Sequence, residues 1–148
     1  MSTVAQLKKR LLAVRGKAQE FAIQALNDNR EIAADLNASQ LAQGMMKDGK
    51  LSKFEYSPVT VAIKETKTGL SSVTDHLTNY DTGESYQKLY MRANENVVTF
   101  GTYTDKEESI SKRMKNKAFG LTNDNKEEFI RLHAQQSFNK LMKENLKL

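Results

Sequence analysis

A turn and two strand-like runs occupy residues 81–104, DTGESYQKLYMRANENVVTFGTYT. Asp81-Thr82-Gly83 is typical of a turn, because an Asp side chain bonds the nearby backbone and Gly readily adopts positive φ. Residues 86–93 and 97–103 are rich in Leu, Val, Thr, Phe and Tyr, which suit a half-buried pleated surface. Because the turn-prone Asn94-Glu95-Asn96 separates the two runs, the segment predicts a β-hairpin.

Helical periodicity precedes the hairpin. Apolar residues recur at three- and four-residue steps across residues 3–35, which predicts an amphipathic helix longer than the usual ~11–12 residues. A break is expected near Asn27-Asp28-Asn29, because these side chains compete for backbone hydrogen bonds, and a short helix should follow. Ser57-Pro58 predicts the start of another helix, which Gly69 would end. Its inward-facing residues would be Val59, Ala62, Ile63 and Thr66.

Turns and a long C-terminal helix are expected in the rest of the chain. Residues 44–56 indicate a linker with a turn at Asp48-Gly49, and residues 70–80 fit either a strand or an irregular loop. Thr104 and Glu107 have the spacing of a capping box, which predicts a helix to about residue 114. Thr122 or Asn123 then caps a last helix, which runs to the C-terminus. The inner face of this helix would carry Phe129, Ile130, Ala134, Phe138, Leu141 and Met142.

These elements predict an α+β fold, in which a long N-terminal amphipathic helix, a central β-hairpin or small antiparallel sheet, and a C-terminal helix pack together. The C-terminal helix is expected to lie on the sheet. The 148 residues suit one domain, with an N-terminal helical arm at 1–36 and an α+β body at 57–148. Only 39% of the residues are apolar and Trp is absent, so the core is expected to be lean and completed by neighbouring subunits. Five methionines are expected to leave apolar surface for such partners: Met45, Met46, Met91, Met114 and Met142.

Catalytic and metal-binding patterns do not emerge from the sequence, so a non-enzymatic protein without cofactors is expected. The chain has no Cys, and His76 and His133 lack the spacing of a metal site. Asp75-His76 suggests a proton relay, but no Ser or Cys in a nucleophile motif accompanies the pair. His133 is interpreted as a partly buried packing residue. No run approaches the ~20 apolar residues of a membrane span and no signal peptide is evident, so cytoplasmic synthesis without membrane contact is expected.

The net charge of +5 is compatible with contact to nucleic acid or to an acidic protein surface. Basic residues gather near the N-terminus and again after the hairpin, without the interleaved aromatics of a single-strand binder. The first interpretation of these runs is a solvated helix face. The alternative is contact with phosphate backbones in a small basic nucleic-acid-binding protein. The candidate contact residues are Lys8, Lys9, Arg10, Lys112, Arg113, Lys115 and Lys117.

The order of short motifs in the second half resembles a family of tailed-phage virion proteins. Thr82-Gly83 opens the hairpin, Phe100-Gly101-Thr102 closes it, and Ala118-Phe119-Gly120-Leu121 precedes the final amphipathic helix. This order is similar to that of the neck, tail-completion or head–tail connector proteins, over residues 82–148. The segment between the two Phe-Gly pairs departs from the family, because it is Lys-rich and lacks the usual Tyr-Ala.

The resemblance implies a structural subunit of the virion neck or tail, assembled in the host cytoplasm. Such a subunit would form a cyclic homo-oligomer, contact the portal and other neck or tail proteins, and touch passing DNA non-specifically. An exposed strand edge and a long helix are suitable parts for such contacts. For the apolar stripe of the first helix, packing within its own domain is the alternative. The candidate interface residues are Leu7, Leu11, Val14, Phe21, Val97 and Phe100.

Overall fold

Two helices joined at a sharp break form the N-terminal part of the computed structural model, which describes residues 3–52 and 55–147. Helix α1 (Val4–Asp28) begins with a capping box, in which Thr3 and Gln6 each bond the other's backbone amide. It ends at Asn29, whose side-chain amide donates to the carbonyl of Ala25, and α2 (Arg30–Ala42) follows directly. The expected break is therefore confirmed, with the physical cause that the sequence suggested.

Strands β1 (Leu89–Asn94) and β2 (Val97–Thr102) form the predicted hairpin. They pair antiparallel, with Asn94 opposite Val97 next to a two-residue turn. Residue 86, expected in the first strand, lies instead in the short helix α4 (Glu84–Gln87). Gly83 precedes this helix with a φ of +85°, a conformation that glycine adopts without steric cost.

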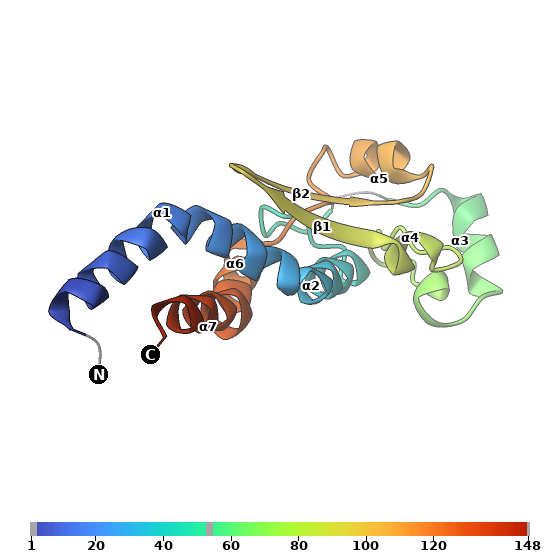
Figure 1. Cartoon of the computed structure of the whole chain (residues 1–148). Helices are drawn as coiled ribbons and strands as arrows, with labels where there is room; N and C mark the ends of the chain where they lie inside the picture. Colours follow the sequence, from blue (N-terminus) through green and yellow to red (C-terminus); the bar gives the residue numbers. More distant parts are fainter. Residues whose placement is uncertain (1–2, 53–54, 148) are drawn as a thin grey trace.

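The C-terminal helix packs against the sheet and against α1, as Figure 1 shows. It consists of α6 (Asn123–Phe129), the π-helical segment η2 (Ile130–Ala134) and α7 (Gln135–Leu146). The Thr122 hydroxyl caps α6 by accepting from the Asn125 amide, which confirms the predicted start. One core cluster joins α2, the sheet and this helix through Ala33, Met91, Ala93, Leu121, Phe129 and Ala134. The α+β fold expected from the sequence is therefore observed.

A second core cluster joins the end of α2 to α5 (Glu107–Arg113) and the loops around them. Helix α3 (Pro58–Glu65) and the 3-10 helix η1 (Gly69–Ser72) lie beyond this cluster and contribute no residue to it, and Figure 1 shows α3 at the end of the molecule away from the N-terminus. Ser57 caps α3 as predicted, by accepting from the Thr60 amide. The sequence left a strand or an irregular loop open for residues 70–80. Residues 73–80 form a loop, whereas residues 70–72 belong to the 3-10 helix η1, which neither alternative predicted. The buried members of the cluster are Leu41, Met46, Leu77, Ile110, Met114 and Ala118.

Buried amides of α2 hold the loop at 118–122 in place. The side chain of Asn37 donates to the carbonyls of Ala118 and Gly120 and accepts from the Gly120 amide. Gln40 donates to the same Gly120 carbonyl and accepts from the Thr122 amide. Because buried backbone groups are costly when unpaired, these two side chains determine the path of the loop between α5 and α6.

Three expectations about helix faces and caps are wrong. All four residues expected to face inward are exposed: Val59, Ala62 and Ile63 on α3, and Thr66 at its C-cap. The helix instead buries Lys64, and it ends at Glu65 rather than at Gly69. The cause is that the Lys64 stem, not the apolar face, packs inward and places its ammonium over the ring of Tyr56.

The capping box of α5 is also absent. Glu107 is the first residue of the helix, and its carboxylate accepts from the backbone amide of Thr102 at the end of β2. The Thr104 hydroxyl lies 3.3 Å from that of Ser85 instead. On the last helix Ile130 is exposed, because the π-helical segment that begins there shifts the helical register of the inner face.

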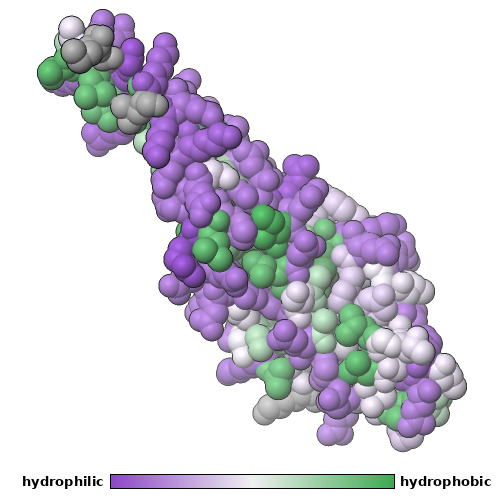
Figure 2. Space-filling model, turned by 90° about the horizontal axis from the view of Figure 1, so that it is seen from below, coloured by the Kyte–Doolittle hydropathy of each residue, from purple (hydrophilic) through white to green (hydrophobic). Residues whose placement is uncertain are grey.

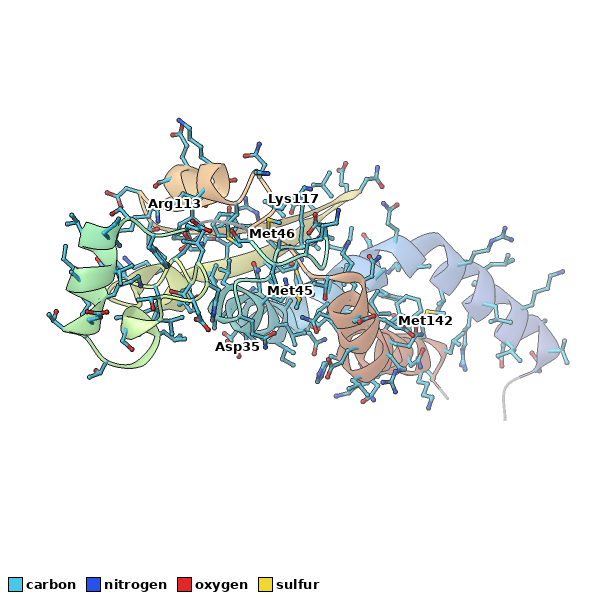
Figure 3. The ribbon with its side chains drawn as sticks, turned by 180° about the vertical axis from the view of Figure 1, so that it is seen from behind. Asp35, Met45, Met46, Arg113, Lys117 and Met142 are labelled. Carbon is cyan, nitrogen blue, oxygen red and sulfur yellow. The ribbon has the colours of Figure 1, made fainter. Side chains whose placement is uncertain are left out.

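The methionines contribute to the interior rather than to a partner surface. Met46, Met91 and Met114 are buried in the two core clusters, whereas Met45 and Met142 are half-buried. Figure 3 shows Met45 and Met46 inside the body and Met142 on α7, where it packs in a third cluster with Val14 and Phe21. The expectation that all five would serve partners is therefore corrected.

Candidate functional site

The first turns of α1 project beyond the rest of the molecule. Helix α7 runs along α1 and ends at Leu146, whose carbonyl accepts from Arg10 at 3.4 Å. Residues 4–13, here called the overhang, precede Val14, the first buried residue of α1, and span about 15 Å at 1.5 Å per residue. Figures 1 and 2 show the overhang as a narrow projection with hydrophobic atoms near its tip. Its exposed apolar residues are Val4, Leu7, Leu11 and Leu12, of which Val4 is 85% and Leu12 60% exposed.

A projecting helical segment of ten residues with four exposed large apolar side chains is unusual in an isolated chain. Helices shorter than ~12–15 residues are marginal in water, so the overhang relies on the packed part of α1 for its conformation. That part is buried by α7, where Val14 and Phe21 contact Leu146. A second protein surface on the overhang would both bury its leucines and stabilise its helix.

The hairpin has one protected edge and one open edge. Asn94 and Val97 form the hydrogen-bonded pair next to the turn, so alternate residues point their backbone groups outward: Leu89, Met91 and Ala93 on β1, and Val98, Phe100 and Thr102 on β2. On β2, Glu107 accepts from the outward amide of Thr102. The side chain of Asn27 bonds both outward groups of Ala93 at 2.9 Å, and helices α1 and α2 pack against β1 on this side of the hairpin. Among the described residues, no group bonds the outward backbone atoms of Val98 or Phe100.

An apolar groove adjoins the open edge of β2. It encloses about 390 Å³ between β2, the loop at 118–122 and the start of the C-terminal helix. Lys47 and Lys126 are the charged residues of its rim, and the acidic residues Asp124, Glu127 and Glu128 lie exposed on the same helix α6. The apolar lining consists of Leu26, Met91, Val98, Phe100, Phe119, Leu121, Phe129 and Ile130.

The structure separates the candidate interface residues into two groups. Leu7 and Leu11 are exposed on the overhang, and Val97 is exposed at the tip of the hairpin. Val14 and Phe21 are buried by α7, so they contact their own domain, which was the alternative left open for the stripe. Phe100 is half-buried against the first core cluster and also lines the groove. The groove itself escaped sequence analysis, because its walls come from segments far apart in the chain.

The two basic runs lie at separate ends of the molecule, on the overhang and around α5 (Figures 1 and 3). Lys8, Lys9, Lys112 and Lys115 are exposed. The others bond groups of the same chain: Arg10 donates to Leu146, Arg113 to Ser109 and Asn79, and Lys117 pairs with Asp48 at 2.9 Å. The runs therefore do not form one continuous basic face.

Asp75 and His76 connect a loop to the end of α2. Nε2 of His76 lies 2.6 Å from the carbonyl of Ala42, and Nδ1 lies 2.9 Å from the Asp75 carboxylate. Both ring nitrogens thus face oxygen atoms of the chain. His133 is half-buried with its ring 6.4 Å from that of Phe129, in line with a packing residue.

Within residues 3–52 and 55–147, no three His, Asp or Glu side chains lie close enough to hold a metal ion. No helix in the same residues is both long enough and apolar enough to span a bilayer. Comparison with known proteins returned no matching family model, no similar curated protein and no similar solved structure.

Proposed function

We propose that this protein is a structural subunit that assembles into a cyclic homo-oligomer in the neck or tail of a tailed-phage virion. In this proposal it joins the portal to other neck or tail proteins and is not an enzyme. The observation that supports assembly is the pair of unmatched apolar surfaces, the overhang and the groove, on one chain. The motif order of residues 82–148 supports placement in a virion.

The overhang of one subunit would occupy the groove of the next. The contact is heterologous, because two different surfaces meet, and such contacts form rings when the rotation between subunits closes. Leu7, Leu11 and Leu12 would displace water from the groove. Each would contribute about 1.5–3 kcal/mol to the free energy of association if fully buried. Lys8 and Lys9 would face the acidic residues of α6, which favours this orientation of the overhang.

Disulfide trapping tests the contact directly, because the natural chain contains no Cys. The double variant Leu11→Cys/Val98→Cys is expected to form a ladder of covalent oligomers under mild oxidation. The matched control is Leu11→Cys/Val59→Cys, since Val59 is also an exposed valine but lies on α3 outside the groove. Equal ladders from the two variants, or none from either, would remove the proposed contact.

Light scattering across a concentration series, with and without added portal protein, tests the wider proposal. A discrete ring, or a monomer that assembles only on the portal, is the expected result. A monomer or dimer that ignores the portal at every concentration would contradict the connector role. That result would favour the alternative function, in which the exposed lysines of the overhang and α5 bind nucleic acid.

A further inference from the structure

Four basic side chains line a hollow between α3, η1 and α5. Figure 1 shows that α3 and α5 lie away from the overhang. The hollow encloses about 300 Å³, and it is called the basic hollow below. Its basic residues are Lys64, Lys67, Lys106 and Arg113, and Asp81 is the one carboxylate of its lining. Four cations against one anion leave an excess of three positive charges.

Lys64 is the most informative of these residues. It is only 8% exposed, yet no carboxylate of the described residues lies within 4 Å of its ammonium. Its Nζ donates to the carbonyl of Ser71 at 3.1 Å and lies 4.7 Å from the centre of the Tyr56 ring. An ammonium has three donors, and a buried charge that no carboxylate contacts directly is costly, so this group favours an anion in the hollow.

The other cations are only partly neutralised. Lys67 and Lys106 share Asp81, at 2.8 and 3.8 Å. Hydrogen bonding from Lys67 lowers the pKa of the Asp81 carboxyl, and the charges of Lys106 and Lys64 lower it further. Arg113 bonds only neutral groups, the Ser109 hydroxyl at 2.8 Å and the Asn79 side-chain oxygen at 3.4 Å. Its guanidinium therefore retains donors for a charged acceptor.

We infer that the basic hollow binds a phosphoryl group, held by Lys64, Lys67, Lys106 and Arg113. A phosphate carries up to two negative charges, which matches the excess of positive charge better than a single carboxylate does. Its tetrahedral oxygens can accept from donors that approach from several segments, and Arg offers a fork that suits them. The group belongs either to a free phosphate or nucleotide or to a nucleic-acid backbone, and the test below separates these sources.

The sequence alone did not indicate this site. Arg113 stood in a predicted basic run, but its neighbours there, Lys112 and Lys115, do not line the hollow. Lys64, Lys67 and Lys106 lie isolated from that run, and the fold brings them to it. The inference is independent of the proposed assembly, because neither the overhang nor the groove contributes a residue to the basic hollow.

The experiment is a titration of the isotope-labelled full chain with inorganic phosphate, followed by amide NMR spectra. Saturable shifts confined to residues around the hollow, such as Ser71 and Asn79, are expected, with a Kd near or below about 1 mM. Lys64→Met and Arg113→Gln should each weaken binding at least about fivefold, whereas Asp81→Asn should strengthen it by a similar factor. Lys112→Met is the matched control, with an expected change below about twofold, because this exposed lysine of α5 lies outside the hollow.

A second titration uses a single-stranded oligonucleotide of about twelve nucleotides at two salt concentrations. A backbone ligand predicts tighter binding than phosphate, a steep loss with salt, and competition by inorganic phosphate. A free phosphate or nucleotide predicts that the oligonucleotide binds no better than phosphate. Either result supports the site if Lys64→Met and Arg113→Gln each weaken the binding at least about fivefold. Absence of saturable shifts with both probes, or equal losses in Lys112→Met, would overturn the inference.

Discussion

Asn27 and Ala93 are joined by two hydrogen bonds through a single side chain, with Nδ2 donating to the Ala93 carbonyl and Oδ1 accepting from its amide, both at 2.9 Å. The amide of Asn27 thus takes the place of a neighbouring strand at the outer edge of β1. This arrangement attaches the hairpin to α1. Because α2 also packs against β1, another chain can approach the sheet only from the side of β2.

Replacing Asn27 by Ala should lower the free energy of unfolding by about 2–3 kcal/mol, since both backbone groups of Ala93 lose their partner. Urea denaturation followed by circular dichroism measures this change. Gln19→Ala is the matched control, because this other amide of α1 also bonds the hairpin, at Glu95 and Asn96, but in an exposed place. The control should lose less than about 0.5 kcal/mol. Equal losses would show that Asn27 has no special role in closing the edge.

Replacing Asn37 by Leu, a residue of similar size, should cost about 3 kcal/mol or more. The substitution leaves buried backbone groups of Ala118 and Gly120 without their partner, and an unpaired buried polar group is expensive. The same denaturation experiment applies. Asn139→Ala, which removes an exposed bond to Gln135 on α7, should change the stability by less than about 0.5 kcal/mol. A neutral Asn37→Leu would mean that the loop at 118–122 is held by its apolar contacts alone.

Substitutions at Gly83 and Gly49 distinguish the free-energy cost of backbone strain from that of a steric clash. Both have positive φ, at +85° and +80°, so an Ala at either should cost about 1–2 kcal/mol. At Gly83 the new Cβ would also lie 2.5 Å from the Tyr80 hydroxyl oxygen, whereas at Gly49 it would meet nothing within 4 Å. Gly83→Ala should therefore lose about 1 kcal/mol more than Gly49→Ala in thermal unfolding. Equal losses would indicate that Tyr80 moves aside freely.

Gly16→Ala should raise the stability by about 0.5–1 kcal/mol, because glycine in the interior of a helix is unfavourable relative to alanine. Gly16 lies within α1, and a Cβ there would meet no atom within 4 Å. Thermal unfolding measures the gain. A loss of stability would show that α1 bends or contacts another surface at this residue. The helical conformation of the overhang should be stabilised as well, because helix formation is cooperative.

The ion pairs of Asp81 predict a small dependence of stability on pH. Because the folded state lowers the pKa of this carboxyl, its contribution is present above the unfolded pKa of ~3.9 and is lost as the pH falls through the lower folded value. When the pH is lowered from about 5 to about 2, the free energy of unfolding should therefore fall less in Asp81→Asn than in the natural chain. The difference should stay below about 1 kcal/mol, since the side chain is 60% exposed and screened by solvent. Asp105→Asn, at an exposed position, is the control for general charge effects. If the stability of the natural chain and that of Asp81→Asn depended on pH in the same way, the proposed contribution of the Asp81 ion pairs would be contradicted.

The elements that sequence analysis predicted correctly depend on neighbouring residues. Asn29 ends α1 through a bond to Ala25, Ser57 caps α3 through Thr60, and Thr122 caps α6 through Asn125. Each partner lies within four residues, so the interaction is visible in the pattern itself. The hairpin belongs to the same group, since a two-residue turn joins strands of suitable composition.

The predictions that were wrong depend on contacts that lie outside the local sequence pattern. The Glu107 carboxylate accepts from the Thr102 amide at the end of β2 instead of forming a capping box with Thr104, because that amide would otherwise lack a partner. Helix α3 buries Lys64 instead of Val59, because Tyr56 and Ser71 offer its ammonium partners that a helical pattern cannot reveal. Val14 and Phe21 are covered by α7, which begins more than a hundred residues later.

Local order in this chain follows from its sequence, because caps, turns and periodicity act over a few residues. The surfaces on which function depends were decided only by the tertiary structure. Packing of α7 on part of α1 left the overhang exposed, and packing of α1 and α2 against β1 covered one side of the hairpin and not the other. The groove and the basic hollow combine residues from distant segments, and their burial and charge arise only when those segments meet.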